Sequence, residues 1–236
     1  MIHVISASNR HLYRDQLAEM HRLRTVHFVG ERGWKNLTII NGGEYDQFDD
    51  DRTVYVLALD AQGHVLGGTR ARPTDDQSML NDLFPELIAP DTPAVKGPDV
   101  WEMGRTFLTH DARRQQKRTG RRLTIDLLIG ASEWLNDHGI ERIISITSLD
   151  IFAMCKSWGW NIRMTGLPIE LPDGPIIGLE AANTLADVEG FRRMAGRTSR
   201  VGLVVTDADI AVFGSLAAIE AEFAEARRDE LVTSGR

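Results

Sequence analysis

The sequence contains one cysteine, Cys155, among its 236 residues. A single cysteine excludes a disulfide framework within the chain and any cysteine-rich metal site. The seven histidines show no HExxH or comparable ligand spacing, so we predict no metal. Because Cys155 follows Phe152 and Met154 and precedes Trp158, we expect a buried core thiol rather than a nucleophile.

Long apolar runs and an excess of basic residues are also missing. No apolar run approaches the ~20 residues of a membrane-spanning helix, and the stretch from Met1 to Ser8 is too short and polar for a secretory signal. The net charge is −7, the pI is near 5.5, and no basic tail is present. We therefore expect a cytoplasmic protein that has neither a membrane nor nucleic acid as a partner.

The chain length suits a single domain, 1–236, in which 206–236 form a C-terminal helical extension. A chain of this size buries roughly 70–75% of its unfolded surface, so it needs no disulfide or metal to hold a core. The runs 53–59 and 64–72 predict an antiparallel hairpin, whereas alternating strand and helix patterns in the second half predict parallel pairing. Together they predict an α/β fold with a mixed central sheet flanked by helices.

A dense acidic loop is the most distinctive stretch that the chain does contain. Five carboxylates fall within the eight residues 44–51, and Tyr45 and Phe48 are interleaved with them. Acidic clusters are usually solvated surface features. A long loop that carries its own aromatic residues is more typical of a binding loop than of a spacer.

Arginines on apolar surfaces give these carboxylates something to neutralise. Asn9 is positioned to cap a helix over 10–29, and Arg24 lies in the centre of that helix's apolar stripe. An unpaired buried guanidinium would cost several kcal/mol, so Arg24 must pair with carboxylates or a ligand. The alternative is that its long stem reaches water at the surface.

Two predicted strands carry further charged residues. Arg70 and Arg72 follow Gly67-Gly68, a pair that weakens a strand unless a ligand or another backbone approaches closely. The apolar run 100–108 contains Glu102 and Arg105, which strict alternation would place on opposite faces. A bulge at Gly104 would bring the two side chains toward one side.

The run 113–122 is a local basic patch that leads into a helix predicted over 121–136. Backbone N–H groups at a helix start, reinforced by arginines, are suited to a phosphate. The alternative is an exposed, solvated helix start. The spacing from Lys117 to Gly120 loosely resembles the pyrophosphate loop of acyl-CoA N-acyltransferases.

Four groups of residues occur in a fixed order: Arg24, Phe28 and Trp34; then Glu44, Asp46 and Asp49; then Gly67, Gly68, Arg70 and Pro73; then Trp101, Glu102 and Arg105. With these spacings the set resembles the acyl-homoserine-lactone synthases, the LuxI-type autoinducer synthases of bacterial quorum sensing. The likeness is close over the first half of the chain and looser as far as Gly166. It implies a fold akin to the GNAT-type N-acyltransferases, with a V-shaped cleft between splayed strands.

The resemblance implies an acyltransferase with two substrates and no separate cofactor. One substrate is S-adenosylmethionine, and the other is an acyl thioester of acyl carrier protein or of coenzyme A. It implies that Glu102 is the general base that deprotonates the amine. The residues expected to bind S-adenosylmethionine or to form the active-site ion-pair network are Arg24, Phe28, Trp34, Asp46, Asp49, Arg70 and Arg105. The acyl pocket is expected at Met103, Thr106, Phe107 and Thr147, and the phosphopantetheine or carrier contacts at Lys117, Arg118 and Arg121.

The sequence departs from the family pattern beside the Glu-x-x-Arg motif. Gly104 and Thr106 stand where many members have serine and phenylalanine. This departure leaves the shape of the acyl pocket and the oxyanion arrangement open. The carrier is open as well, because the basic patch would suit either acyl carrier protein or the phosphates of coenzyme A. Two other functions also stay open at this point: an acyl-CoA N-acyltransferase that acts on another amine, and a non-catalytic sensor of S-adenosylmethionine or an acyl group.

Overall fold

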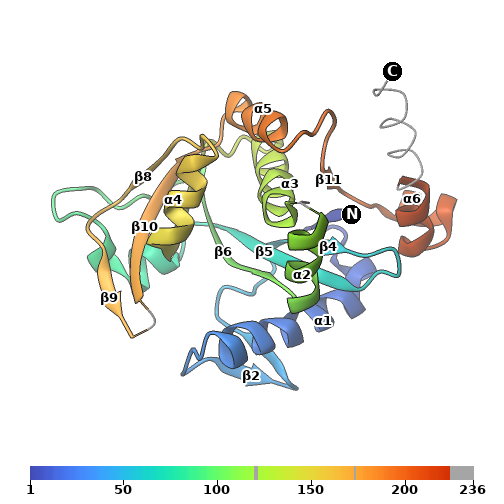
Figure 1. Cartoon of the computed structure of the whole chain (residues 1–236), viewed down its shortest axis with the longest axis horizontal. Helices are drawn as coiled ribbons and strands as arrows, with labels where there is room; N and C mark the ends of the chain where they lie inside the picture. The colour runs from blue at the N-terminus through green and yellow to red at the C-terminus, as the bar shows by residue number, and fades with distance from the viewer. Residues whose placement is uncertain (120–121, 173, 224–236) are drawn as a thin grey trace.

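The computed structural model describes residues 1–119, 122–172 and 174–223 of the 236-residue chain. Its described part contains a nine-stranded mixed sheet and a separate two-stranded hairpin (Figure 1). The large sheet has the order β11 (Gly202–Leu203), β1 (Ile2–Ile5), β4 (Val54–Leu59), β5 (Val65–Pro73), β6 (Val100–Leu108), β7 (Arg142–Ser148), β10 (Gly174–Ala182) and β8 (Ile162–Met164), with β9 (Ile169–Leu171) also paired to β10. The hairpin joins β2 (Thr38–Ile40) to β3 (Gly43–Tyr45).

Helices cover both faces of the sheet. On one face α3 (Leu123–Asp137) packs on β1 and β4, and α5 (Leu185–Met194) packs against α3 (Figure 1). On the other face α1 (Arg14–Arg24) packs on β5 and also contacts β3 of the hairpin. Alternating residues of β4 divide between the two cores, with Val56 facing α3 and Tyr55 and Leu57 facing α1. The remaining helical elements are η1 (Arg10–Tyr13), η2 (Thr25–Glu31), η3 (Met79–Leu83), η4 (Pro85–Leu87), α2 (His110–Thr119), α4 (Leu149–Ser157) and α6 (Asp207–Phe213).

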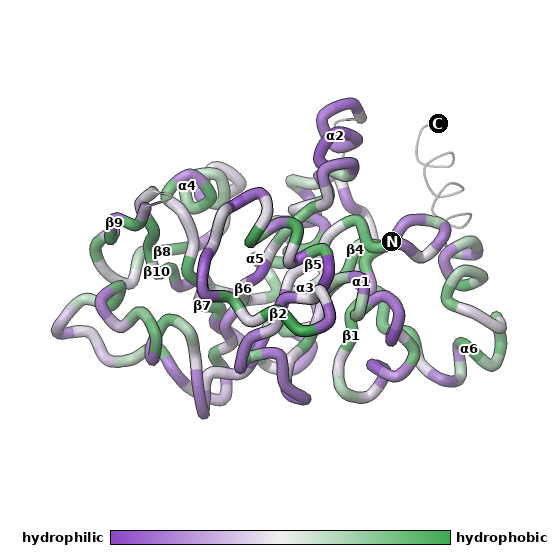
Figure 2. Tube along the Cα trace, turned by 90° about the horizontal axis from the view of Figure 1, so that it is seen from below, coloured by the Kyte–Doolittle hydropathy of each residue, from purple (hydrophilic) through white to green (hydrophobic). Residues whose placement is uncertain are grey.

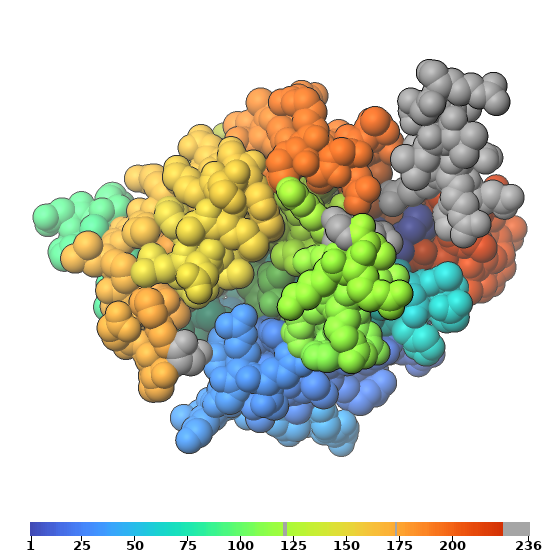
Figure 3. All heavy atoms as spheres, in the orientation of Figure 1, coloured from blue at the N-terminus to red at the C-terminus, as the bar shows by residue number. Residues whose placement is uncertain are grey.

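The sheet opens between β6 and β7. Parallel pairing of β6 with β7 is restricted to Val100, Trp101 and Glu102, although β6 continues to Leu108 and β7 to Ser148. The strands therefore diverge beyond Glu102. Figure 3 shows the molecule hollowed between α4, α2 and the blue N-terminal segment. This geometry agrees with the V-shaped cleft that the family resemblance implies.

The predicted mixed sheet is confirmed, but the pairing within its second half was predicted wrongly. β7 pairs antiparallel to β10, and β10 pairs antiparallel to β8 and β9. Parallel pairs join β6 to β7 and β1 to β11. The helical pattern after β7 predicted a crossover, but α4 is followed by two short strands that let β10 return beside β7 in the opposite direction.

Two local predictions also need correction. The helix expected over 10–29 is divided into η1, α1 and the π-helical η2. Asn9 does not cap it, because its side chain accepts a hydrogen bond from the Ser6 amide and donates to the Val4 and Val205 carbonyls. The basic patch is not a loop before a helix: most of it is α2, an independent helix.

A buried polar cluster connects β1 with the helical turns at 216–223. His3, which is fully buried, contacts the Tyr13 hydroxyl at 2.8 Å and the Glu220 carboxylate. The α-amine of Met1 lies 3.1 Å from Glu220. Burial alone would raise the pKa of Glu220. The His3 hydrogen bond and the nearby amine lower it by more than burial raises it, so the net pKa lies below the ordinary value. Glu220 therefore helps to fix the helical turns at 216–223 on the sheet.

Glu220→Gln is expected to lower the free energy of unfolding at pH 7 by about 2–3 kcal/mol, because charge-assisted hydrogen bonds are lost. A depressed carboxylate pKa gives stability that is present above the unfolded pKa and is lost as the pH falls through the folded pKa. Urea unfolding at several pH values should therefore show the difference between wild type and variant shrinking below about pH 4.5. A difference that persists unchanged at pH 3 would contradict this role.

Candidate active site

The inner part of the site is a closed cluster of buried charges. Arg24 from α1 donates Nε–H to Glu44 at 2.6 Å and both terminal nitrogens to Asp49 at 2.7 and 2.8 Å. The Tyr55 hydroxyl donates to Asp49 at 2.9 Å. The side chains of Arg24 and Glu44 are fully buried, and that of Asp49 is 2% exposed. Because these groups neutralise one another away from solvent, this inner part fixes the acidic loop on α1.

The outer part of the cluster lies nearer the surface. Arg70 from β5 contacts both Asp46 oxygens at 2.5 and 3.0 Å and Asp49 at 3.0 Å. Arg105 from β6 contacts Asp46 at 2.8 Å and Glu44 at 3.1 Å. Asp46 is 12% and Arg105 8% exposed. Three guanidinium groups thus face three carboxylates, and Asp46 and Arg105 are the members with most access to a ligand.

Opposite charges shift the pKa values of this cluster apart. Burial alone would raise the pKa of Asp49. The hydrogen bonds from Arg24 and the charges of Arg24 and Arg70 lower it by more than burial raises it, so the net pKa is strongly depressed. Burial lowers the pKa of Arg70, and its two carboxylate partners more than offset that effect. Both groups are therefore ionised at neutral pH.

A bulge in β6 turns Arg105 toward this cluster. Gly68 pairs with Phe107 and Arg70 pairs with Gly104, so Arg105 and Thr106 together lie opposite Thr69. Arg105 has φ +54°, an uncommon conformation for a residue with a side chain. The predicted bulge is therefore present, although the left-handed residue is Arg105 rather than Gly104.

The glycines of β5 admit a neighbouring strand. A Cβ atom on Gly67 would lie 2.6 Å from the Phe107 carbonyl oxygen, and one on Gly68 would lie 2.7 Å from a Leu57 methyl group. Either contact would force an atom to move. The glycine pair therefore serves close packing with β6 and β4 rather than the approach of a ligand.

Two aromatic rings lie beside the outer charges. Phe28 from η2 stacks on Trp34 with 4.9 Å between ring centroids. The Arg105 guanidinium lies 5.4 Å from the Phe28 centroid and 5.6 Å from that of Trp34. The structure thus brings together all seven residues that were expected in the ion-pair network and its aromatic neighbours.

Glu102 lies at the point where β6 and β7 separate. Its carboxylate accepts hydrogen bonds from the backbone amides of Met79 at 2.5 Å and Leu80 at 2.7 Å, at the start of η3. Burial raises the pKa of Glu102 and outweighs the opposing effect of the two amides. The amides fix the orientation of the carboxylate, and its elevated pKa makes it a stronger base than an exposed glutamate.

The residues expected in the acyl pocket do not share one apolar surface. Met103 packs in the core beneath α3, whereas Phe107 packs in the core beneath α1. Thr106 is exposed on the bulge, where its hydroxyl lies 2.8 Å from that of Thr69. Thr147 lies on β7 opposite Ile177.

A third apolar cluster lies between η3, η4 and the strands β7 and β10, next to Glu102. It includes Leu80, whose amide binds Glu102. Some of its side chains are only partly buried: Phe84, Ile88, Ile146, Ile169 and Ile176. No spacing or motif in the sequence indicated that this cluster borders the site.

The predicted carrier contacts Lys117 and Arg118 lie in the last turn of α2, and Arg121 lies outside the described residues. Figure 2 shows α2 as a predominantly hydrophilic helix. The predicted core thiol of Cys155 is buried, and burial raises its pKa to about 11, which disfavours the thiolate.

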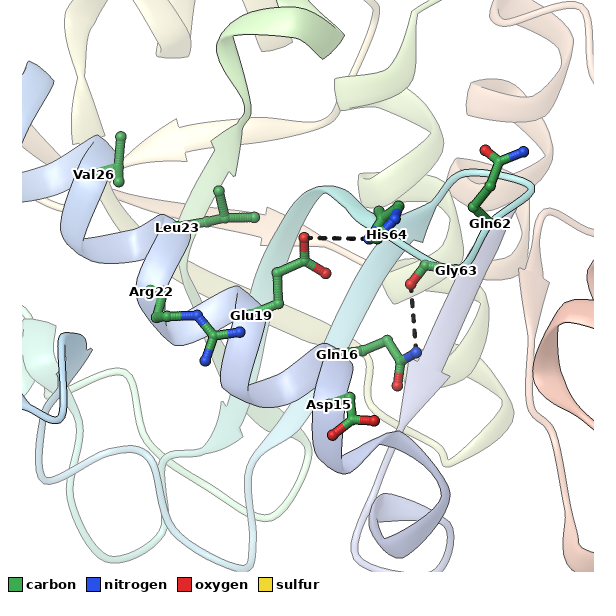
Figure 4. Close-up of a pocket in the computed structure, with 9 residues that line it drawn as sticks. All are labelled: Asp15, Gln16, Glu19, Arg22, Leu23, Val26, Gln62, Gly63 and His64. Atoms are coloured by element: carbon green, nitrogen blue, oxygen red, sulfur yellow. Dashed lines mark hydrogen bonds and ion pairs between the residues drawn. The ribbon is translucent and has the colours of Figure 1, made fainter.

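A surface groove of about 600 Å³ lies elsewhere, between α1 and the turn that joins β4 to β5 (Figure 4). Its lining includes Glu19, Arg22 and His64. None of the predicted site residues lines this groove. The residues placed by the structure include no group of three or more histidine, cysteine or acidic side chains that could hold a metal ion. They also form no helix long and apolar enough to cross a membrane.

Three contributors to the site were not assigned from the sequence. Glu44 was noted in the acidic loop, but its contacts with both Arg24 and Arg105 were not expected. Tyr55 appeared to be an ordinary strand residue, and its hydroxyl binds Asp49. The His21 Nδ1–H donates to the Glu44 carbonyl oxygen at 2.8 Å, and the ring stacks on Tyr45. The position of His21 one turn before Arg24 on the same helix could have indicated that it lies beside the cluster.

Comparison with known proteins assigns this arrangement to a family. The family model for autoinducer synthases matches residues 8–180. The isovaleryl-homoserine lactone synthase of Bradyrhizobium diazoefficiens is 38% identical over 172 residues, covering 71% of this chain and 73% of that protein. An acyl-homoserine-lactone synthase of Agrobacterium fabrum is 30% identical over 164 residues, covering 70% and 77%.

A solved structure supports the same assignment over nearly the whole chain. It is the CoA-dependent acyl-homoserine lactone synthase BjaI with SAM and isopentyl-CoA, at 31% identity and a TM-score of 0.78, with 94% of this chain and 99% of that chain covered. The match to the family model, the sequence identities and the shared fold agree with one another. This chain is an acyltransferase that belongs to the autoinducer synthase family and makes a quorum-sensing signal.

Proposed function

We propose that the chain transfers an acyl group from an acyl-CoA thioester to the amine of S-adenosylmethionine and then closes the lactone. In the first step the amine nitrogen attacks the thioester carbonyl, the amine loses a proton, and the CoA thiolate leaves. In the second step the methionyl carboxylate attacks the carbon next to the sulfonium, and methylthioadenosine leaves. The proposed reaction uses these two substrates and needs no separate cofactor.

The observation that carries the proposal is the juxtaposition of an ion-pair cluster, an aromatic pair and Glu102 beside the opening between β6 and β7. S-adenosylmethionine has two cationic groups, a carboxylate and an adenine. Asp46 is suited to attract its cations, and Arg70 and Arg105 are suited to bind its carboxylate. The faces of Phe28 and Trp34 suit the adenosyl group and the sulfonium.

The cluster divides into a structural part and a substrate-binding part. Arg24, Glu44 and Asp49 are buried and mutually paired, so their role is to hold the acidic loop in place. Asp46 and Arg105 are the more accessible members. We assign substrate contacts to the latter pair and to Arg70, which connects the two parts.

Glu102 is the proposed general base. Its pKa is raised by burial, so the carboxylate holds a proton from the amine more tightly than an exposed glutamate would. The amides of Met79 and Leu80 keep it oriented, and a bridging water can complete the path to the amine. Backbone N–H groups on the diverging part of β6 are suited to stabilise the oxyanion.

The apolar cluster beside Glu102 is the proposed acyl site. Its partly buried isoleucines and Phe84 form an apolar surface that suits a short or branched hydrocarbon chain and disfavours a charged group. The two relatives named for an isovaleryl product and for CoA dependence support an acyl-CoA donor. Lys117 and Arg118 are suited to bind either CoA phosphates or an acidic carrier protein.

A product assay tests the proposal. Purified protein is incubated with S-adenosylmethionine and a panel of straight and branched thioesters, each supplied on coenzyme A and on acyl carrier protein. We expect methylthioadenosine and an acyl-homoserine lactone in equal amounts, with branched short-chain acyl-CoA the best donors. Faster turnover of the acyl-carrier-protein thioesters would overturn the donor assignment, and absence of lactone with every donor would overturn the proposed reaction.

A further inference from the structure

An ion pair connects two elements that border the cleft, η2 and α2. Arg113 from α2 donates from one terminal nitrogen to both oxygens of Glu31 at 2.6 and 2.7 Å. Its other terminal nitrogen donates to the Leu108 carbonyl at 2.9 Å, at the end of β6. One guanidinium therefore holds the end of η2, the end of β6 and the first turns of α2 together.

His27 extends this contact toward the proposed substrate site. Its Nδ1 lies 2.9 Å from Glu31 and 3.2 Å from Arg113, so it donates to the first or accepts from the second according to its tautomer. Its ring packs edge-on against the adjacent Phe28, with 4.9 Å between centroids. The Phe28 ring carries Trp34 on one side and lies near the Arg105 guanidinium.

The backbone at the end of η2 also depends on this position. The Arg32 amide binds the His27 carbonyl at 3.0 Å, and the Trp34 amide binds the Phe28 carbonyl at 2.9 Å. Glu31 lies within both of the segments that these two bonds close. π-Helical turns such as η2 are rare and are found mainly at functional sites, where neighbouring contacts stabilise them. The Arg113–Glu31 pair is such a contact.

The neighbouring arginine on α2 provides a contrast. Arg114 pairs with Asp111 of the same helix, and its side chain is 65% exposed. That pair connects no second element. The difference between Arg113 and Arg114 is therefore one of position, because both carry the same charge on the same helix.

We propose that Arg113 and Glu31 are positioning residues that hold the Phe28–Trp34 ring pair in its substrate-binding arrangement. The inference rests on the proposed function, because it takes these rings to be the wall of the S-adenosylmethionine site. Neither residue touches the reacting atoms. Their effect is to reduce the freedom of η2, so less ordering is required when the substrate binds.

Glu31→Gln and Arg113→Gln test the proposal by calorimetric titration of S-adenosylmethionine without any acyl donor. We expect each variant to bind it about fivefold more weakly than wild type, in line with the small free energy of a partly exposed ion pair. The thermal midpoint should fall by no more than about 3 °C. The double variant should bind no more weakly than either single variant, because both substitutions remove the same contact.

Arg114→Gln is the matched control, since it removes one positive charge from the same helix and should leave the affinity unchanged. Arg113→Lys keeps the charge but has one nitrogen in place of the two that bind Glu31 and the Leu108 carbonyl, so it should restore the affinity only in part. Wild-type affinity in both single variants would overturn the inference. Weaker binding in Arg113→Gln alone would also overturn it, because that result would indicate a simple charge effect. Failure of both variants to fold would overturn it as well. If wild type itself does not bind S-adenosylmethionine, the proposed function fails instead.

Discussion

Asp49→Asn is expected to lower the free energy of unfolding by about 3–5 kcal/mol, the cost of removing one partner from a buried ion pair. Asp49 receives two hydrogen bonds from Arg24 and one from Tyr55, and it also pairs with Arg70. The neutral amide would leave two buried guanidinium groups short of negative charge. Urea unfolding followed by circular dichroism, with thermal melting beside it, measures the loss.

Asp51→Asn is the matched control for this prediction. Asp51 belongs to the same acidic loop, but its side chain is fully exposed and its contact with Arg10 is 3.3 Å long. Its replacement should change stability by no more than about 0.5 kcal/mol. Equal losses in the two variants would show that the loop is held by its overall charge and not by the buried cluster.

The stability that Asp49 provides also depends on pH. Its pKa is depressed in the folded protein, so its contribution is present above the unfolded value, about 3.9, and is lost as the pH falls through the folded value. The difference between wild type and Asp49→Asn should therefore stay constant from pH 5 to 8. It should begin to narrow below about pH 3.9 and continue to fall as the pH is lowered further.

Glu102→Gln is expected to lower kcat by about 10²–10⁴-fold, the usual contribution of a positioned base. The dissociation constant for S-adenosylmethionine should change by less than about twofold, because Glu102 lies outside the charge cluster that is proposed to bind it. Steady-state kinetics and calorimetry on the same preparation separate the two effects. The glutamine side chain has one oxygen in place of two, so it cannot reproduce both hydrogen bonds from the η3 amides. A thermal melt of the variant must therefore show that its stability is retained.

Glu86→Gln controls for the loss of one acidic group near the site, because Glu86 is exposed on the neighbouring η4. It should leave kcat unchanged. The raised pKa of Glu102 further predicts that wild-type kcat/KM falls on the acid side at a higher pH than an exposed glutamate would give. Full activity in Glu102→Gln would show that another group, or solvent, takes the proton from the amine.

Charge placement was the part of this site that could be predicted from the sequence. Arg24 in the centre of an apolar stripe required buried carboxylates, and the acidic loop was the dense supply close to it. The glycine between Glu102 and Arg105 predicted the bulge in β6. Periodicity identified the hairpin of β4 and β5 and the long helix α3.

What could not be predicted depends on contacts between distant segments. The return of β10 beside β7 is decided by tertiary pairing, which helix and strand patterns do not encode. Asn9 has the residue type of a helix cap, but its position lets the side chain bind the Val4 and Val205 carbonyls instead. The amides that hold Glu102 come from η3, some 20 residues away, and no local pattern indicated them.

The central claim is that the accessible part of the charge cluster binds S-adenosylmethionine while the buried part holds the fold. Calorimetric titration of S-adenosylmethionine into Asp46→Asn tests it most directly, because Asp46 pairs with both Arg70 and Arg105. We predict a folded variant whose dissociation constant rises at least about tenfold, as expected for the loss of a charge-assisted contact. An affinity within twofold of wild type would contradict the claim and make the whole cluster structural.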